Sequence, residues 1–307
     1  MKVLVVGASG LLGRRIVTRL RAGGHTAVAV ARTPRDGVDH AVDATTADVE
    51  TWLPLLAGCD GVVFAAGADD REVPARPAYS AFHAGNVVPV VTLLTAARQA
   101  GATRAVVLGS YFTHFNREHP EWDLAGAHPY IRSRVAQAAE GRTAAGPGLP
   151  VAVVEVPFVF GRAGDRFPAW AEGLVGWVSS KSPLLAPTGG TAVTTAETVA
   201  DIAVDALEAA SGADLPAADG NLTWAEMIGG LAAAAGNPRP VKVLPSAVFR
   251  LALRLTALRY RFSGKEPGLH PTRLADLLLR HLHLTGTGTR PIDPAMVETV
   301  EAVREKG

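Results

Sequence analysis

The chain has 307 residues, of which 48% are hydrophobic and 19% charged, and its formal net charge is +1. This composition supplies a large core and excludes global disorder, and the near-neutral charge argues against nucleic acid as a partner. Cys59 is the only cysteine, which rules out an intrachain disulfide and fits a reduced, cytoplasmic setting. We find no leader ahead of the first strand and no apolar run of the roughly 18 residues that span a bilayer, so we expect no membrane partner.

The first sixteen residues, MKVLVVGASGLLGRRI, carry the strongest signal. The run Val3–Val6 is typical of a strand buried on both faces, and an amphipathic helical pattern follows it. Gly7, Gly10 and Gly13 lie between them. A strand, a glycine turn and a helix N-terminus form an anion site, because the first backbone N–H groups have no helical partners. We expect Gly7 to permit the turn, Gly10 to admit a pyrophosphate and Gly13 to let the helix pack close.

This stretch therefore predicts a dinucleotide site, and the alternative is a glycine-rich turn without a ligand. The residues expected to contact the cofactor here are Gly7, Ser9, Gly10, Leu11, Leu12, Gly13 and Arg14.

The end of the second predicted strand, Thr26–Ala31, indicates which dinucleotide binds. In an NAD site an acidic residue near this point would hold the ribose diol. Here the strand is followed by Arg32, whose planar guanidinium suits a 2′-phosphate. The pattern favours NADP (NADPH) over NAD, and the alternative is that Arg32 is a solvated surface charge.

Three further stretches are expected to reach the same cofactor. Asp43 ends a short third strand and is expected at the adenine edge. The fourth strand, Gly61–Ala65, is followed by Ala66 and Gly67, whose small size leaves room for the nicotinamide side. A helix is predicted over Tyr79–Ala100, and a fifth strand over Ala105–Leu108 leads to Ser110.

Strands that alternate with helices in this way predict an α/β fold, a Rossmann-type doubly wound parallel sheet with right-handed crossovers. Ligands on such sheets bind beyond the carboxyl ends of the strands, so these strand ends share one rim. We expect an NADP-binding domain over residues 1–160. A smaller C-terminal substrate lobe is expected over 161–307, with about 190–212 returning to the main sheet.

Tyr130 and Arg134 open the next predicted helix and lie on one helical face, because they are four residues apart. A fixed positive charge near a phenol lowers its pKa and makes it a usable acid or base. The same cation could hydrogen-bond ribose hydroxyls. The alternative is an exposed tyrosine above a surface arginine on an ordinary helix.

Residues 111–129 are predicted as a loop beside the rim, with His114, His119 and His128. Their spacings of five and nine residues do not match the close pairs of metal sites, and no cysteine is near, so no metal is expected. Histidines at a substrate mouth are the favoured interpretation.

The chain resembles the extended short-chain dehydrogenase/reductases, the NAD-dependent epimerase/dehydratase family. The motifs that carry the resemblance are GASGLLG at 7–13, Asn86-Val87, PYIRSRVAQAAE at 129–140, VEVPFVFG at 154–161 and NLTWAEM at 221–227. The resemblance implies that Tyr130 is the acid or base for the substrate oxygen and that Ser110 polarises that oxygen. It also places Asn86 and Pro157 among the cofactor-binding residues.

Three departures from that family's pattern affect the predicted chemistry. Arg134 replaces the family lysine; it keeps the charge but cannot relay protons. Because the register of LGSYFTHF is open, Tyr111 or Thr113 could take the place of Ser110. Glu155 stands where the family usually has arginine, and a buried carboxylate there needs a partner.

In the C-terminal part, Ser246–Phe262 is a basic amphipathic pattern with Arg250, Arg254, Arg259 and Arg261. The favoured interpretation is a core helix with snorkelling arginines, and the alternatives are a membrane-surface helix or a helix that packs on a partner. The aromatic residues between 157 and 170 either line the substrate pocket or pack the lobe.

The function predicted from the sequence is NADP-dependent oxidoreduction or epimerisation. The substrate would be a carbonyl or alcohol on a small molecule of sugar-nucleotide or secondary-metabolite type. The alternatives are a redox-neutral cyclase, dehydratase or lyase on the same fold, or a non-catalytic NADP-sensing protein. A homodimer is expected by the same resemblance.

Overall fold

The computed structural model describes residues 1–286 and 288–306. The chain divides into two compact units. The first comprises Met1–Glu155, Val199–Leu215 and Gly264–Leu269, and the second comprises Val156–Thr198, Pro216–Ser263 and His270–Gly307. The first unit thus ends at 155, five residues before the predicted boundary of 160, and its return segment begins at 199 rather than 190. The short return at 264–269 has no counterpart in the sequence prediction.

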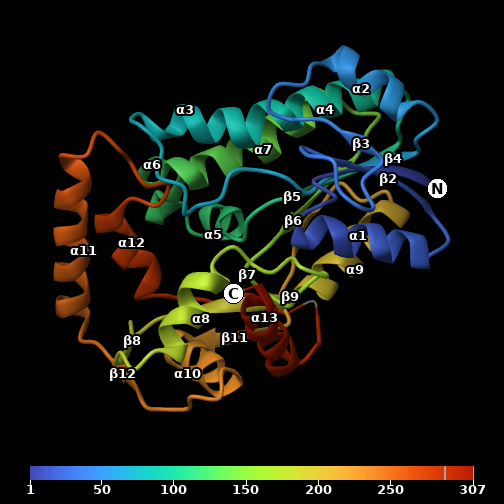
Figure 1. Ribbon diagram of the computed structural model, residues 1–307. Coiled ribbons are helices and arrows are strands. Elements are labelled where there is room, and N and C mark those ends of the chain that lie inside the picture. The colour runs from blue at the N-terminus through green and yellow to red at the C-terminus, as the bar shows by residue number, and fades with distance from the viewer. Residues whose placement is uncertain (287, 307) are drawn as a thin grey trace. The chain divides into compact units, whose positions relative to one another are not determined.

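A seven-stranded sheet forms the centre of the first unit, with strand order β10-β6-β5-β4-β1-β2-β3 (Figure 1). The pairs from β6 through to β3 are all parallel, as predicted. The strand order reverses between β1 and β4, and such a switch point opens a crevice at the carboxyl ends of the strands. The strands are β1 Lys2–Val6, β2 Thr26–Ala31, β3 His40–Ala41, β4 Gly61–Phe64, β5 Arg104–Leu108, β6 Val151–Glu155 and β10 Asp214–Pro216.

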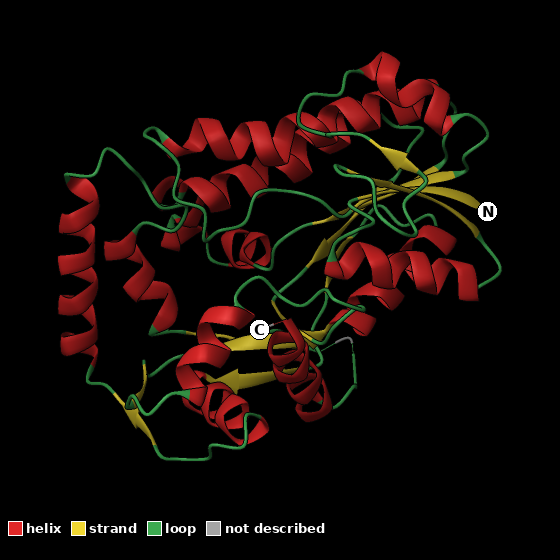
Figure 2. Ribbon diagram, in the orientation of Figure 1, coloured by secondary structure: helices red, strands yellow, loops and turns green. Residues whose placement is uncertain are grey.

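Helices lie on both sides of this sheet (Figure 2), which explains why its central strands are continuous apolar runs. The helices assigned to the same part of the chain are α1 Leu11–Ala22, α2 Val49–Leu56, α3 Ala78–Phe82, α4 Val88–Gln99, α5 Phe112–Glu118, α6 Leu124–Ala127, α7 Pro129–Ala145 and α9 Ala196–Glu208. The α/β doubly wound prediction is confirmed.

Two predicted elements differ from the structure in kind, and the third strand, β3, ends at Ala41 rather than at Asp43. The expected helix Tyr79–Ala100 is α3 and α4 joined by a π-helical turn, His83–Val87. The segment 111–129, expected as a loop, is mostly helical: α5, a 3₁₀ turn at Pro120–Trp122 and α6. Buried Phe112 and Phe115 provide the apolar contacts that favour helix there.

The stretch Ala78–Gln99 is long and apolar enough to cross a membrane by length and composition, a candidate that the sequence prediction did not include. Half of its most apolar window is buried, and α4 packs against both α2 and α7. The stretch therefore serves as a core helix of the first unit.

The second unit contains a four-stranded sheet, in which β9 pairs with β7, β11 and β13, and a separate β8–β12 pair. Its strands are β7 Phe158–Phe160, β8 Leu184–Ala186, β9 Gly190–Thr195, β11 Gly220–Thr223, β12 Val241–Val243 and β13 His281–Leu282. Its helices are α8 Ala171–Ser179, α10 Trp224–Ala234, α11 Ser246–Arg261, α12 Pro271–Leu278 and α13 Ile292–Lys306. Phe158, Phe160 and Trp170 form an aromatic cluster within the core of this unit, as the packing alternative requires.

Candidate active site

The glycine turn between β1 and α1 has the geometry that its spacing predicts. Gly7 has a φ of +87°, a conformation that L side chains rarely adopt, and its amide donates to the Val30 carbonyl of β2 at 2.9 Å. A Cβ on Gly13 would lie 2.1 Å from the Gly7 carbonyl oxygen, so only glycine lets α1 approach this closely. Helix α1 begins after Gly10, without a side-chain cap or an acidic residue in its first turn.

This turn fits a dinucleotide pyrophosphate. A Cβ on Gly10 would meet only the Gly7 carbonyl oxygen within 4 Å, at 3.3 Å, so one side of Gly10 is open. The first turn of α1 contains no carboxylate, so its backbone N–H groups are available to an anion without competition from a side chain of that turn. Ser9, Leu11, Leu12 and Arg14 belong to the same turn and are half-buried. Their contacts with a cofactor stay a prediction.

Arg32 follows β2 directly and is exposed, and its contact with a 2′-phosphate stays a prediction. Its charge also acts on Asp43. The pKa of Asp43 is lowered, first by hydrogen bonds from Thr45 and in smaller part by Arg32. The Asp43 carboxylate accepts from the Thr45 amide at 3.0 Å and from its hydroxyl at 2.7 Å. One carboxylate oxygen is therefore engaged in a local turn, and an adenine contact at Asp43 stays a prediction.

The end of β4 lies directly beside the glycine turn. A Cβ on Gly7 would lie 2.6 Å from the Ala65 carbonyl oxygen. Beyond Ala65 and Ala66, Gly67 has a φ of +144°, and a Cβ there would lie 2.6 Å from Asn86 Oδ1. The predicted small residues therefore serve a close approach of two backbone segments.

Asn86 is fully buried, and its side chain is hydrogen-bonded to other residues of the protein. Its Oδ1 accepts from the Ala68 amide at 2.8 Å and from Arg134 Nη1 at 3.3 Å, while its Nδ2 donates to Ser133 Oγ at 3.1 Å. The π-helical turn places it there, and such turns are frequent at functional sites. The side-chain hydrogen-bonding groups of Asn86 thus have partners within the fold, and its contact with the cofactor stays a prediction.

Tyr130 is the second residue of α7, and its hydroxyl is hydrogen-bonded to the Ser110 hydroxyl. The rings of Phe82 and Phe112 lie edge-on to the Tyr130 ring at centroid distances of 5.8 and 6.5 Å. On the other side, the Tyr130 amide donates to the Gly268 carbonyl at 3.0 Å. Two aromatic rings and one backbone hydrogen bond thus hold Tyr130 in place, and its hydroxyl hydrogen-bonds to Ser110.

The Ser110–Tyr130 contact decides which residue of LGSYFTHF faces the tyrosine. Thr113 Oγ1 lies 2.7 Å from the Ser110 carbonyl oxygen and 2.8 Å from Glu155 Oε1, so its hydroxyl serves the backbone and a buried carboxylate. The Tyr111 ring packs on Phe112 and Phe115. Of the three candidate hydroxyls, the geometry therefore favours Ser110.

Arg134 acts on Tyr130 less strongly than the sequence predicts. Burial raises the pKa of Tyr130, and the Arg134 charge and the Ser110 hydrogen bond lower it only in part, while Asp70 and Asp69 raise it further. The net direction is upward, so the expected lowering is wrong for this structure. Arg134 Nη2 donates to the Leu108 carbonyl at 2.7 Å and Nη1 to Asn86, so both terminal nitrogens have partners within the protein.

Asp69 and Asp70 belong to this site, and sequence reasoning missed them. They follow Gly67 beyond the end of β4. Their position after a strand, at the carboxyl edge of the sheet where ligands bind, could have indicated them in the sequence. Burial and then the Asp69 charge raise the pKa of Asp70 to about 7. At Asp69 burial raises the pKa, but the Arg71 charge and hydrogen bonds outweigh it, so the net direction is downward. The pair therefore holds one proton close to neutral pH.

Replacing Asp70 by Asn should make the protein more stable at alkaline pH. The pKa of Asp70 rises from 3.8 to about 7 on folding, so the folded state binds the proton more tightly, and stability falls as pH rises from about 4 to 7. Asn carries no such penalty. We expect the melting temperatures of Asp70→Asn and wild type to be similar at pH 4 and to diverge in favour of the variant at pH 8.

Asp36→Asn, in the exposed loop after β2, is the matched control for the Asp70 experiment. It should run parallel to wild type across this range. Parallel curves for Asp70→Asn would contradict a proton shared by the two carboxylates.

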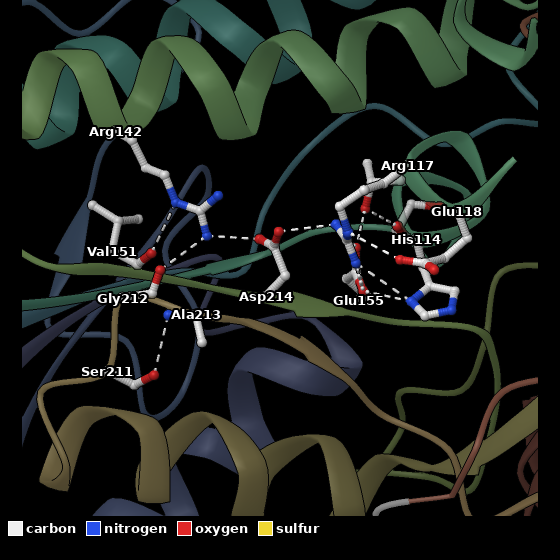
Figure 3. A network of polar contacts seen from close by, with 12 residues as sticks. His114, Arg117, Glu118, Arg142, Val151, Glu155, Ser211, Gly212, Ala213 and Asp214 are labelled. Carbon is white, nitrogen blue, oxygen red and sulfur yellow. Dashed lines mark hydrogen bonds and ion pairs between the residues drawn. The ribbon is translucent and has the colours of Figure 1, made fainter. Parts of the chain in front are cut away.

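Glu155, at the end of β6, is fully buried and finds the partners that the sequence could not name (Figure 3). Arg117 donates to its carboxylate from Nη1 at 3.1 Å and from Nη2 at 3.2 Å, and His114 Nδ1 lies 3.5 Å from Oε2. Arg117 Nη1 also donates to Asp214 at 2.9 Å, and Asp214 accepts from Arg142 at 2.6 Å. This chain of ion pairs ties α5 to β6, α7 and the return segment of the first unit.

The three histidines of the segment 111–129 do not share one site. His119 stacks on Trp122 at 3.9 Å and pairs with Glu121, whereas His128 is buried at the start of α7. Within residues 1–286 and 288–306, no group of three or more His, Cys, Asp or Glu side chains could hold a metal ion. Pro157 belongs to the second unit, and its role in cofactor binding stays a prediction.

Comparison with known proteins shows what the first unit is similar to. A protein-family model described as NAD(P)H-binding matches residues 7–157. A 4-hydroxy-2-methyl-3-oxo-4-farnesyl-3,4-dihydroquinoline-1-oxide ketoreductase from Stigmatella aurantiaca is 28% identical over 183 residues, which cover 54% of this chain. The match spans 53% of that relative, about half of its length.

Solved structures share the fold over the whole chain. The crystal structure of gox2253 has a TM-score of 0.79 at 19% identity and covers 99% of this chain and 98% of its own. The human epimerase family protein SDR39U1, solved with NADPH, has a TM-score of 0.68 at 20% identity and covers 98% and 99% of the two chains. Residues 7–157 are therefore similar to an NAD(P)H-binding domain, and the chain as a whole shares the fold of these solved structures.

Proposed function

We propose that this protein is an NADPH-dependent reductase of a carbonyl group on a small molecule, with Tyr130 as the proton donor. The observation that carries the proposal is the hydrogen-bonded Ser110–Tyr130 pair at the carboxyl end of β5. It belongs to the same unit as the glycine turn of β1, on a sheet whose strand order reverses beside β4. The ketoreductase named among the relatives supports the same reaction class.

The direction of the Tyr130 pKa shift favours reduction. A raised pKa keeps the phenol protonated at neutral pH, which suits a group that gives a proton to a developing alkoxide. Removal of a proton from an alcohol, the first step of an oxidation, would need the phenolate. Carbonyl reduction is the activity for which this protonation state of Tyr130 is directly suited.

Each residue of the site has a separate role in the proposed reduction. NADPH, when bound, supplies the hydride that adds to the carbonyl carbon. Ser110 donates to the carbonyl oxygen and orients it, and Tyr130 transfers its hydroxyl proton to that oxygen, so the product is an alcohol. Tyr130 then regains a proton from water. Arg134 stays charged throughout and holds α7 to the end of β5 through the Leu108 carbonyl.

The proposal is tested by the consumption of NADPH in the presence of ketones. Purified protein is mixed with NADPH and a panel of sugar-nucleotide ketones and aromatic ketones, and absorbance at 340 nm is followed together with product analysis. Stoichiometric loss of NADPH with formation of an alcohol supports the reductase. Product without net loss of NADPH overturns it in favour of a redox-neutral reaction, the second candidate, which the replacement of the family lysine by Arg134 favours.

Arg32 is the basis for preferring NADPH over NADH. Arg32→Ser should weaken NADPH binding by about tenfold to a hundredfold and leave NADH binding nearly unchanged, because only NADPH carries the phosphate that a guanidinium would bind. Calorimetric titration of both nucleotides measures the two affinities. Arg21→Ser, on the exposed side of α1, is the control. Equal losses for both nucleotides at Arg32→Ser would contradict a 2′-phosphate contact.

A further inference from the structure

Helix α11 exposes a continuous apolar stripe, contrary to the core helix expected from the sequence. The stripe consists of Val248, Leu251, Leu255, Leu258 and Phe262. Leu255 is 62% exposed and Phe262 80%, values that large apolar side chains seldom show together on one face. The spacing of three and four residues places all of these side chains on one side of the helix.

The opposite side of α11 already has a partner. Phe249, Leu253, Ala257 and Tyr260 recur at helical spacing and are half-buried, and α11 packs against α12 of the same unit (Figure 1). Arg250 of α11 and Asp276 of α12 form an ion pair at 2.5 Å. Because α11 packs on α12 through the half-buried side, its contacts with the rest of the unit do not depend on the exposed stripe.

Charge decides what kind of surface the stripe fits. The segment 246–261 contains four arginines and no acidic residue. At 100° per residue, Arg254 and Arg259 flank the stripe on its two sides. Both are exposed, and neither makes an ion pair with another residue of the described chain. A second copy of α11 against the stripe would bring arginines against arginines, whereas an anionic surface would neutralise them.

We infer that α11 lies on an anionic lipid bilayer, with its leucine stripe in the acyl region and its flanking arginines at the phosphate level. An apolar face bordered by arginine is the pattern of helices that lie in the membrane interface. At about 24 Å for sixteen residues, and with four charges, the helix lies along the bilayer rather than across it. The inference replaces the expectation of no membrane partner, and it does not depend on the proposed function.

Vesicle flotation tests the inference with the full-length protein. Vesicles of phosphatidylcholine that contain about 30% of the anionic lipid phosphatidylglycerol are compared with vesicles of phosphatidylcholine alone. Wild type should float with the anionic vesicles and much less with the neutral ones. The double variant Leu255→Gln/Leu258→Gln should partition at least about tenfold more weakly, because two side chains lose their apolar burial.

The flanking charges and a matched control complete the design. Arg254→Gln/Arg259→Gln should weaken flotation about fivefold for each arginine, and raised salt should do the same to wild type. Val297→Gln removes an exposed apolar side chain of α13 and should change nothing. All variants replace exposed residues, so circular dichroism and NADPH binding should match wild type.

Several outcomes would overturn the inference. One is a wild-type protein that stays with the soluble fraction at both compositions. Another is flotation that the α11 variants leave unchanged. Light scattering adds a third: a dimer that Leu255→Gln/Leu258→Gln converts to monomer would make a second copy the occupant of the stripe.

Discussion

Tyr130→Phe should lower kcat for carbonyl reduction by about a thousandfold while the Kd for NADPH stays within about twofold of wild type. The substitution removes only the hydroxyl that meets Ser110, and the ring keeps its contacts with Phe82 and Phe112. Without that hydroxyl, the developing alkoxide has no positioned proton donor. Steady-state kinetics at 340 nm and calorimetric titration of NADPH measure the two quantities separately.

Tyr79→Phe is the matched control for this experiment. Tyr79 lies on α3 of the same unit, its ring packs on His83 and the Arg132 guanidinium lies over it, so loss of its hydroxyl should leave kcat unchanged. Ser110→Ala should give a smaller loss than Tyr130→Phe, because it removes an orienting hydrogen bond and not the proton itself. If Tyr130→Phe retained wild-type turnover, Tyr130 would have no catalytic role and the proposed chemistry would fail with it.

Arg117→Met should lower the free energy of unfolding by about 3 kcal/mol. Glu155 is buried at the end of β6, and the substitution leaves its carboxylate without the guanidinium that contacts both of its oxygens. Thr113 and His114 stay beside the carboxylate but do not replace a fixed positive charge, and a buried charge that loses its ion-pair partner is strongly destabilising. Urea denaturation monitored by circular dichroism measures the change.

The double variant Arg117→Met/Glu155→Leu separates loss of the ion pair from loss of packing. Removing both charges should recover a large part of the stability, because no charge then stays buried without a partner. Arg162→Met, which breaks the pair with exposed Glu305, should change stability far less. A double variant that is destabilised by the sum of both single changes would show that Glu155 and Arg117 are not coupled.

Local patterns in the sequence were sufficient for most of the elements that form the dinucleotide half of the molecule. The limits of β2 match the prediction at Thr26–Ala31, and the apolar run predicted as a strand at Val3–Val6 lies in β1. Both depend on neighbours within a few positions. The segment 111–129 was predicted wrongly, because its helices are stabilised by burial of Phe112 and Phe115 rather than by a clear apolar period.

The sequence predicted which types of residue form the candidate site, but it predicted few of the contacts between them. The sequence favoured Ser110 but left Tyr111 and Thr113 open, and only the approach of α7 to the end of β5 brings Ser110 to Tyr130. The hydrogen bonds that Asn86 makes with Ala68 and Arg134 likewise depend on segments far apart in the chain.

The sequence by itself determined the α/β class, the glycine turn and the presence of a tyrosine with a cation one helical turn away, because these follow from spacing along a few residues. Tertiary structure alone decided the partner of Glu155, the upward direction of the Tyr130 pKa and the exposure of the α11 stripe. Each of these depends on burial by segments far apart in the chain. An amphipathic period shows that a helix has an apolar face, but not whether protein covers it.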